Sequence, residues 1–222
     1  MSADSMYDFA VIGVGPAGAR FAQQAADRGH RVIAFEQGEI GTPLACSGHV
    51  STDIYKYLPP GAASALRQNE ISAANFHLGG PDTPGHRFYR DETISVVIDR
   101  VGLDRALAAA AADAGAEVHT HHTVTAVQPS EQHVDVEVQA PDGPDQVRAR
   151  MVIGADGPTS RTRDALGIGP PGELLHGVLG FDPTPDTAGH VDVHLIVPGF
   201  FAWRIPRGDA GVEYGIAGTP GP

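Results

Sequence analysis

Apolar residues at the start of the chain form two short unbroken runs on either side of an alanine-rich stretch. The runs at 7–12 and 31–35 have the length and β-branched content of strands that are buried on both faces of a parallel sheet. Between them, small apolar residues recur at helical spacing over 17–28, and Gly29 ends this predicted helix. The pattern therefore predicts a strand, helix, strand unit of a parallel α/β fold.

The pattern of the later segments predicts shorter elements and one hairpin. Strands are predicted at 71–78, 86–90, 94–98, 117–119 and 123–127, and a helix at 103–114. The run 133–138 alternates polar and apolar residues, as half-exposed antiparallel strands do, and is expected to pair with 146–150. Residues 151–155 are apolar again and lead to Asp156. In contrast, 37–58 lack clean periodicity and are predicted to form a loop.

The turn after the first strand has the sequence G-V-G-P-A-G, which suits a dinucleotide pyrophosphate. Gly13 permits the tight turn, Gly15 leaves the backbone open to the phosphates, and Gly18 allows the helix to pack closely on the strand. Pro16 suits the first helical position, where its missing N–H is no loss. The free amides at this helix N-terminus are expected to point at the phosphates.

An acidic residue, Glu36, ends the second predicted strand about 20 positions after the first glycine, the spacing of the acid that binds the adenosine ribose. A carboxylate there would repel a 2′-phosphate, so we expect FAD or NAD rather than NADP. Glycines in a turn can also be purely structural. The strand, helix, second strand and acid in register favour the dinucleotide interpretation.

The charge of the chain excludes one class of partner. The formal net charge is −12 over 222 residues, which does not suit nucleic acid, whose phosphates require basic patches. Cys46 is the single cysteine, so no internal disulfide can form and a reducing compartment is expected. No apolar run approaches the roughly 20 residues of a membrane span, and the N-terminus lacks the features of a signal peptide. The sequence therefore predicts a cytoplasmic protein.

The basic residues are unusual in kind, with Lys56 as the one lysine beside fourteen arginines. An acidic surface that is poor in lysine suits a protein in concentrated salt, where the Debye length falls to roughly 3 Å and self-repulsion no longer matters. We therefore expect a halophilic archaeal source. The codon bias of a GC-rich genome is the alternative explanation.

Several polar or aromatic residues admit both a functional and a structural interpretation. The H-x-H-H cluster at 119–122 contains three histidines, but strand alternation sends them to different faces, so no metal site is predicted. Asp156 could bind a cofactor or could cap the helix that follows it. The Cys46 thiol could be inert, and Trp203 could belong to a core or to the wall of a pocket.

Two glycine motifs together resemble those of FAD-dependent oxidoreductases of the aromatic-hydroxylase structural class. They are G-x-G-P-A-G at 13–18, followed by the acid that ends the second strand, and G-A-D-G-P-T-S-R-T-R at 154–163. Within that class, P-L-A-C-S-G at 43–48, the pair Asp99-Arg100, and P-G-F-F-A-W-R-I-P at 198–206 resemble the geranylgeranyl reductases. The resemblance runs through nearly all of the chain.

The resemblance implies an α/β architecture with a Rossmann-like FAD-binding domain and an inserted antiparallel β substrate domain. The implied FAD-binding domain is discontinuous and covers 1–70 and 91–168, and the substrate domain covers 71–90 and 169–222. The family continues after this segment with a third FAD motif and a further substrate region. We therefore expect a fold that is incomplete at the C-terminus, in a fragment or a truncated product.

The resemblance also implies roles for individual residues. The implied contacts to FAD are made by Gly13, Gly15, Pro16, Ala17, Gly18, Glu36, Gln37, Ala45, Cys46, Arg100, Val124, Gly154, Asp156 and Gly157. Among these, Cys46 is the implied catalytic residue, beside the flavin ring. The implied wall of a pocket for an isoprenoid chain consists of Phe201, Trp203 and Pro206.

For the activity, the resemblance implies reduction of carbon-carbon double bonds in the geranylgeranyl or other isoprenoid chains of archaeal lipids. NAD(P)H or ferredoxin would be the electron donor, and a lipid substrate would bring the protein into brief contact with the membrane. The chain departs from the usual family pattern at Phe201, where tyrosine is usual, at Ile205, where an aromatic residue is usual, and at Arg204, which replaces an apolar residue. An FAD-dependent monooxygenase of the same fold and a truncated, non-catalytic FAD-binding remnant are the alternatives.

Overall fold

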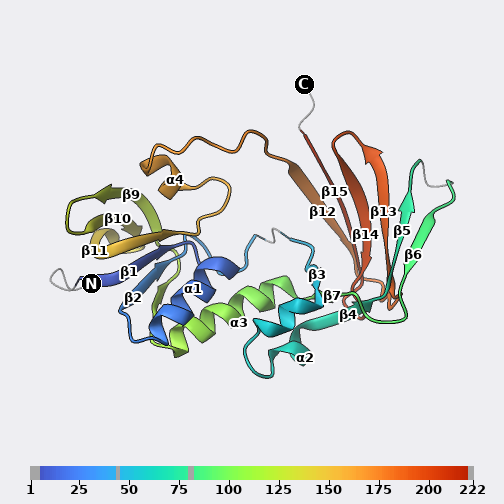
Figure 1. The fold of residues 1–222 in the computed structure, drawn as a ribbon, viewed down its shortest axis with the longest axis horizontal. Coiled ribbons are helices and arrows are strands. Elements are labelled where there is room, and N and C mark those ends of the chain that lie inside the picture. Colours follow the sequence, from blue (N-terminus) through green and yellow to red (C-terminus); the bar gives the residue numbers. More distant parts are fainter. Residues whose placement is uncertain (1–5, 44–45, 80–82, 220–222) are drawn as a thin grey trace. The chain divides into compact units, whose positions relative to one another are not determined.

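The computed structural model describes residues 6–43, 46–79 and 83–219. Its elements fall into two units, of which the first comprises 1–43 and 101–171 and the second comprises 44–100 and 172–222. Figure 1 labels most of the helices and strands of both units. Among the described helices, none combines the length and the apolar character that crossing a bilayer requires.

A six-stranded sheet forms the centre of the first unit. Its strands lie in the order β8 (Glu117–His119), β2 (Val32–Phe35), β1 (Tyr7–Ile12), β11 (Gly143–Gly154), β10 (Val134–Ala140) and β9 (Thr123–Pro129). Neighbours among the first four strands are parallel, whereas β10 is antiparallel to both β11 and β9. The predicted parallel α/β centre is confirmed, and antiparallel strands extend it on one side.

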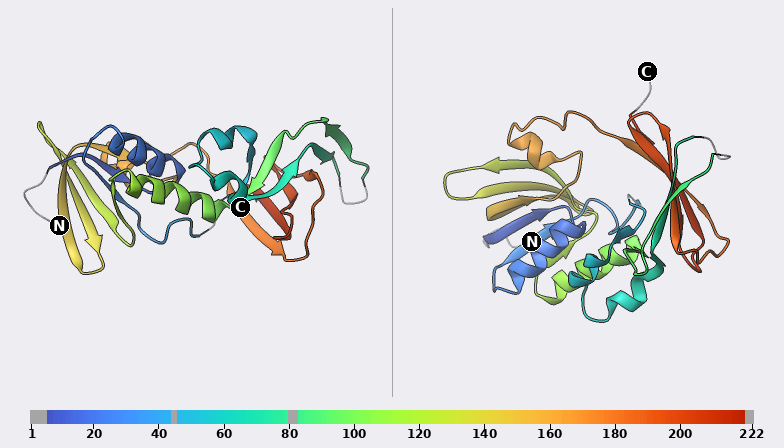
Figure 2. Two further views of the ribbon diagram at one scale, coloured as in Figure 1. Left: turned by 90° about the horizontal axis from the view of Figure 1, so that it is seen from below. Right: turned by 45° about the vertical axis from the view of Figure 1, so that its right-hand side comes forward.

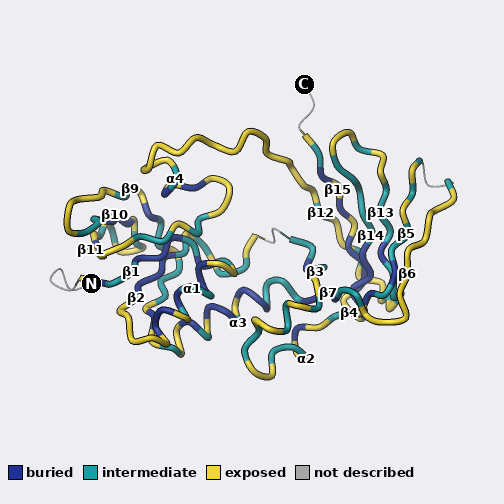
Figure 3. Tube along the Cα trace, viewed as in Figure 1, coloured by how far each residue is buried: buried dark blue, intermediate teal, exposed yellow. Residues whose placement is uncertain are grey.

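Two helices, α1 (Pro16–Ala26) and α3 (Arg100–Asp113), cover one face of this sheet (Figure 2). The ring of Phe21 in α1 packs edge-on against that of Phe9 in β1, with 5.2 Å between the ring centroids. A third, short helix, α4 (Arg161–Ala165), follows β11. Figure 3 shows that β2 is buried along its length and that β1 is buried at Tyr7 and from Ala10 to Ile12, as expected for the apolar runs that the sequence places there.

A six-stranded sheet and a three-stranded sheet make up the second unit. The larger sheet has the order β12 (His176–Asp182), β15 (Val212–Gly218), β14 (Phe200–Pro206), β13 (His190–Val197), β5 (Ala73–His77) and β6 (His86–Tyr89). Its neighbours are antiparallel except for the parallel pair β5 and β13. The smaller sheet has the order β3 (His49–Ser51), β7 (Ser95–Ile98) and β4 (Arg67–Ile71), and the helices are η1 (Thr52–Lys56) and α2 (Ala62–Leu66).

The boundary between the units differs from the predicted domain boundary. The ranges 44–70 and 91–100, predicted to belong with the cofactor-binding part, group with the second unit. A buried cluster explains this grouping, because it joins the smaller sheet to the larger one through Ile71, Val97, Val191 and Ile205. Sequence patterns identify such strands but not the sheet against which they pack.

Individual elements agree with the predictions where the periodicity is clear. The predicted hairpin is confirmed, since Val134 pairs with Ala149 in antiparallel β10 and β11. The apolar stretch 151–155, to which no element was assigned from the sequence, largely continues β11, which is a single strand of 12 residues. The segment 37–58, predicted as a loop, contains β3 and η1, and α2 was not predicted. These short elements carry too few residues to show a period.

Candidate functional site

The glycines of the first motif have two different structural roles. Gly13 has a φ of 90°, and a Cβ there would lie less than 3.0 Å from the carbonyl oxygen of Ala155. A Cβ on Gly18 would likewise lie less than 3.0 Å from the carbonyl oxygen of Gly13. Around Gly15, in contrast, no atom lies within 4 Å of the position that a Cβ would take. Gly13 and Gly18 therefore allow close packing, and Gly15 keeps the turn open at the N-terminus of α1.

The carboxylate of Glu36 lies beside the same turn. Its Oε2 accepts a hydrogen bond from the backbone N–H of Val14 at 2.9 Å, and its Oε1 accepts one from the N–H of Gly38 at 3.4 Å. Glu36 directly follows β2, which is parallel to β1, so the acid and the glycine turn emerge at the same edge of the sheet. This placement is what the spacing of the two features predicted.

The second glycine motif reaches the same edge through the pairing of β1 with β11. Ile12 is in register with Gly154 in this parallel pair, and the N–H of Ala155 donates a hydrogen bond to the carbonyl oxygen of Ile12 at 2.8 Å. Gly154 is needed for packing, since a Cβ there would lie 2.8 Å from the side chain of Thr162. Gly157 follows with a φ of 73°, which favours glycine.

Asp156 organises the turn that leads into α4. Its Oδ1 accepts a hydrogen bond from the Ser160 hydroxyl at 2.6 Å, and its Oδ2 accepts one from the N–H of Thr162 at 3.1 Å. Ser160 in turn caps α4 by accepting a hydrogen bond from the N–H of Arg163 at 3.0 Å. Burial acts to raise the pKa of Asp156, but these hydrogen bonds outweigh it, so the pKa lies below its usual value. The structural interpretation of Asp156 thus has direct support.

A cavity of about 420 Å³ lies where these segments meet, and it contains Asp156 in its wall as well. The predicted cofactor residues in its wall are Gly13, Gly15, Glu36, Gln37, Val124 and Asp156. Its volume is typical of sites for organic ligands. The open position at Gly15, the acid after β2 and the N-terminus of α1 fit a dinucleotide such as FAD.

Other predicted cofactor residues lie outside the wall of this cavity. Pro16 and Ala17 form the exposed first turn of α1, while Gly18, Gly154 and Gly157 shape the two turns. Cys46, which is partly exposed, and Arg100, the first residue of α3, belong to the second unit. Ala45 lies outside the described residues. Contacts of these residues with a cofactor stay predictions.

The cavity wall also contains residues that sequence reasoning missed. They are Ile12, Phe35, His122, Thr123, Ala155, Thr159, Arg161 and Asp164. Arg161 stands inside the second glycine motif, five positions after Asp156, and its place there was a usable signal for a cation in the cavity wall. The rings of His122 and His119 lie 5.0 Å apart, but among the described residues no group of three or more His, Cys, Asp and Glu could hold a metal ion.

A second cavity of about 420 Å³ lies in the second unit and is mostly apolar. Its walls come from β5, β13 and β14, with two polar residues near β3, and consist of Ser47, His49, Ala74, Phe76, Val191, Val193, Phe200, Phe201, Trp203 and Ile205. The ring of Phe201 meets that of Trp203 edge-on, with 5.8 Å between the centroids. Both residues were predicted to line an apolar pocket.

Pro206, the third residue predicted for this pocket, does not reach its wall. Side chains alternate between the two faces of a strand, and in β14 the odd-numbered residues from Phe201 to Ile205 face the cavity. Pro206 therefore falls on the opposite face, and its carbonyl oxygen accepts a hydrogen bond from the Asn69 side chain at 3.0 Å. Ile205, which was not predicted as a site residue, lines the cavity instead.

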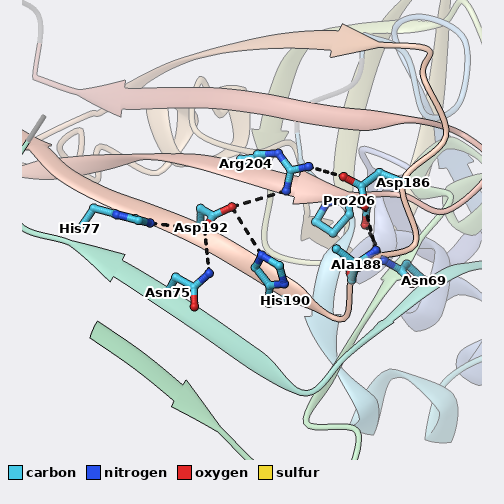
Figure 4. A network of polar contacts seen from close by, with 9 residues as sticks. All are labelled: Asn69, Asn75, His77, Asp186, Ala188, His190, Asp192, Arg204 and Pro206. Atoms are coloured by element: carbon cyan, nitrogen blue, oxygen red, sulfur yellow. Dashed lines mark hydrogen bonds and ion pairs between the residues drawn. The ribbon is translucent and has the colours of Figure 1, made fainter. Parts of the chain in front are cut away.

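Arg204 shares the face of β14 that is opposite to the apolar cavity, and it belongs to a polar network (Figure 4). Its guanidinium donates to the carboxylates of Asp186 and Asp192. Asp192 also accepts hydrogen bonds from the side chains of Asn75, at 2.9 Å, and His77, at 3.3 Å. The charge of Arg204 is therefore balanced within this network and does not enter the apolar cavity.

Comparison with known proteins identifies relatives along nearly the whole chain. Digeranylgeranylglycerophospholipid reductase 1 of Methanopyrus kandleri is 34% identical over 96% of this chain and 58% of its own length. Digeranylgeranylglycerophospholipid reductase 2 of Methanothermobacter thermautotrophicus is 32% identical over 95% of this chain and 56% of its own length. The chain thus spans little more than half the length of these curated relatives.

Solved structures show the same architecture. A geranylgeranyl bacteriochlorophyll reductase-like protein of Thermoplasma acidophilum superimposes with a TM-score of 0.85 at 26% identity, covering 97% of this chain and 57% of that protein. Aklavinone-11 hydroxylase, solved with FAD and aklavinone, superimposes with a TM-score of 0.73 at 20% identity, covering 99% of this chain and 47% of the hydroxylase. Because the hydroxylase is only 20% identical, its similarity to this chain concerns the fold alone.

The profile of a protein family described as FAD binding domain matches residues 6–196. This match includes both glycine motifs and the whole of the sheet that positions them. The chain therefore belongs to the FAD-binding domain family.

Proposed function

We propose that this chain is the FAD-binding and substrate-binding part of a reductase that saturates carbon-carbon double bonds in prenyl lipids. The observation that carries the proposal is the similarity, over 95% or more of the chain, to relatives named digeranylgeranylglycerophospholipid reductase. Both the cofactor cavity and the apolar cavity lie within the matched length.

The apolar cavity supports an isoprenoid substrate. Such a chain offers hydrocarbon and no strong hydrogen-bonding group, and the cavity offers mainly aromatic and aliphatic side chains. Phe201 and Ile205 depart from the usual family pattern but keep the wall apolar. Arg204 lies on the opposite face of β14, so its departure leaves the cavity unchanged in character.

For the chemistry, bound FAD in its reduced form would supply a hydride to one carbon of the double bond, while the neighbouring carbon takes a proton. NAD(P)H or ferredoxin would return the electrons. In this scheme Gly15 and the N-terminus of α1 hold the pyrophosphate, and Glu36 accepts hydrogen bonds from the adenosine ribose. Asp156 would hold the second turn in the shape that receives the cofactor, and Cys46 is the residue that the family resemblance assigns to the flavin ring.

The test uses the full chain with FAD, dithionite as reductant, and digeranylgeranylglycerophospholipid as substrate. Mass spectrometry should show a lipid product that has gained a pair of hydrogens for each reduced double bond. A product that has gained oxygen in aerobic reactions with NADH would instead identify a monooxygenase. An FAD-loaded chain that leaves the lipid unchanged under both conditions would contradict catalysis by this chain.

We further propose that the protein is cytoplasmic and touches the membrane only briefly, to reach a lipid substrate. The net charge of −12 opposes binding to anionic headgroups unless salt screens it. Sedimentation with vesicles of anionic archaeal-type lipids should therefore increase with KCl concentration. Equal binding at low and high KCl would contradict this account.

The surface composition leads us to propose a halophilic archaeal source. One lysine among fifteen basic residues and an excess of acidic residues suit a cytoplasm rich in KCl. Urea unfolding at rising KCl concentration should show increasing stability up to molar salt. Full stability at low salt would instead favour the codon-bias explanation.

A further inference from the structure

Glu213 is a fully buried acidic residue that the cofactor site does not use. It lies in β15 with an exposed fraction of 0%. Its neighbours across the sheet are Ile205 of β14 and Phe181 of β12. A carboxylate between such neighbours loses much of its hydration, so specific partners are needed to keep it there.

Both carboxylate oxygens of Glu213 have a partner. Oε1 accepts a hydrogen bond from the indole Nε1–H of Trp203 at 2.9 Å, and Oε2 accepts one from the guanidinium of Arg207 at 3.3 Å. Arg207 is itself buried, donates from Nε to the side-chain oxygen of Gln68 at 3.0 Å, and lies over the ring of Phe181 at 5.1 Å. Trp203, Glu213, Arg207 and Gln68 thus form one connected hydrogen-bonded group.

This group has features that stability alone does not require. Burial raises the pKa of Glu213 above its usual value, although the hydrogen bond from Trp203 and the charge of Arg207 act in the opposite direction. A buried ion pair is often matched or exceeded in stability by apolar residues of similar volume. An apolar residue in place of Glu213, however, has no atom that could accept the hydrogen bond of the indole N–H.

The indole is the one member of the group that also lines the apolar cavity. Gly215 leaves room for it, because a Cβ at that position would lie less than 3.0 Å from the ring. Phe201 meets it edge-on from the cavity side. The hydrogen bond to Glu213 adds a third contact, which holds the N–H edge of the ring.

We propose that Glu213 is a positioning residue, which holds the Trp203 indole in the wall of the apolar cavity and thereby sets the shape that an isoprenoid chain meets. The role in ligand binding rests on the proposed function, whereas the anchoring of the indole does not. Arg207 holds the second carboxylate oxygen of Glu213, so that the first one faces the indole.

The test exploits Trp203 as the single tryptophan of the chain, so that its fluorescence reports this position alone. The variants of the full chain are Glu213→Gln, which retains an acceptor, and the double variant Glu213→Leu with Arg207→Leu, which removes the acceptor without leaving a buried cation. The exposed Glu92→Gln serves as the matched control. Urea unfolding checks that each variant folds, and farnesol is the apolar probe.

The anchored indole should keep a high fluorescence anisotropy in the wild-type chain, in Glu92→Gln and in Glu213→Gln. In the folded double variant the anisotropy should fall, and farnesol should bind about tenfold more weakly, as expected for one lost hydrogen bond. Wild-type anisotropy in the double variant would overturn the proposal. Where the double variant does not fold, the single variant Glu213→Leu takes its place, and wild-type anisotropy there would likewise overturn the proposal.

This design tests the isoprenoid ligand of the apolar cavity and the anchoring of the indole by Glu213 independently of each other. If farnesol does not change the emission of wild-type Trp203, an isoprenoid ligand for the apolar cavity is contradicted. The anisotropy comparison uses no ligand and still decides whether Glu213 anchors the indole.

Discussion

The indole of Trp203 lies directly over Gly215 of the neighbouring strand. The two residues are paired in antiparallel β14 and β15, and a Cβ on Gly215 would approach the ring to less than 3.0 Å. Glycine at this position therefore allows a large aromatic side chain to lie over the neighbouring strand and to form part of the apolar cavity wall.

We expect Gly215→Ala to displace this indole. The added methyl group forces the ring or the strand to shift, which should lower the free energy of unfolding by about 1–3 kcal/mol. The emission maximum of Trp203 should change as the ring moves. Gly180→Ala on β12 is the matched control, because no atom lies within 4 Å of its added Cβ, and it should leave the emission unchanged. Equal emission from both variants would contradict the described packing.

Two glycines of the first motif should respond differently to alanine. Gly18→Ala places a methyl group against the backbone of Gly13, so the variant should lose about 1–3 kcal/mol or more of stability and should also lose FAD. Gly15→Ala enters open space and should stay within about 0.5 kcal/mol of wild type. Its FAD affinity should nevertheless fall by about tenfold or more, since the methyl group would occupy the space that the glycine motif is expected to leave for the pyrophosphate. Urea unfolding and flavin fluorescence titration measure the two effects, and equal destabilisation by both substitutions would count against the structure of this turn.

The negative charge of Glu36 should strengthen the binding of FAD. Glu36→Gln keeps an oxygen that can accept the N–H of Val14, but hydrogen bonds to an ionised group are stronger. We expect FAD affinity to fall about tenfold, with little change in unfolding. Glu39→Gln, on an exposed residue of the same segment, should bind FAD as the wild type does. A titration of flavin fluorescence compares them, and unchanged affinity in Glu36→Gln would remove this residue from the cofactor site.

Asp156 should make stability depend on acidic pH. Its folded-state pKa lies below the ordinary value of 3.8, so its ionised form stabilises the fold at pH values above 3.8. This contribution disappears as the pH falls through the lower, folded-state pKa. Asp156→Asn should therefore be less stable at neutral pH by about 1–3 kcal/mol, and the difference from wild type should shrink below pH 3.8.

Urea unfolding at several pH values measures this difference. Asp142→Asn, on an exposed turn residue, is the control and should follow the wild-type curve. A constant difference between wild type and Asp156→Asn across the acidic range would contradict the role of the ionised carboxylate in the turn before α4.

The sequence predicted those parts of the fold in which a clear pattern of apolar residues ends at a glycine or a turn. Tyr7–Ile12 is apolar, ends at a glycine and is confirmed as β1 with the predicted bounds. The alternation at 133–138 also predicted its partner, because a hairpin needs only a local turn. In contrast, the pairing of β5 with β13 joins segments that are more than a hundred residues apart. No local pattern encodes such a contact.

The residues of the candidate site also fall into two groups, those that local sequence predicted and those whose position depends on distant strands. Gly13, Gly15 and Glu36 could be placed from one strand, helix, strand unit, and they line one cavity together with Asp156. Trp203 was found through a resemblance, but the same resemblance put Pro206 beside it, although strand alternation sends them to opposite faces. The carboxylate of Glu213 left no recognisable signal, since its burial follows from cross-strand neighbours.

The parallel pairing of β1 with β11 has a consequence for how such a chain can change over evolutionary time. Because Ile12 and Gly154 are paired, the loops among the 141 intervening residues can lengthen, shorten or acquire whole sheets without separating the two glycine turns that meet at the cofactor cavity. An insertion of a single residue within β11 would instead turn the later side chains of the strand to the opposite face and move Asp156 away from the cavity. Tolerance of large additions and intolerance of small ones therefore coexist within the same polypeptide.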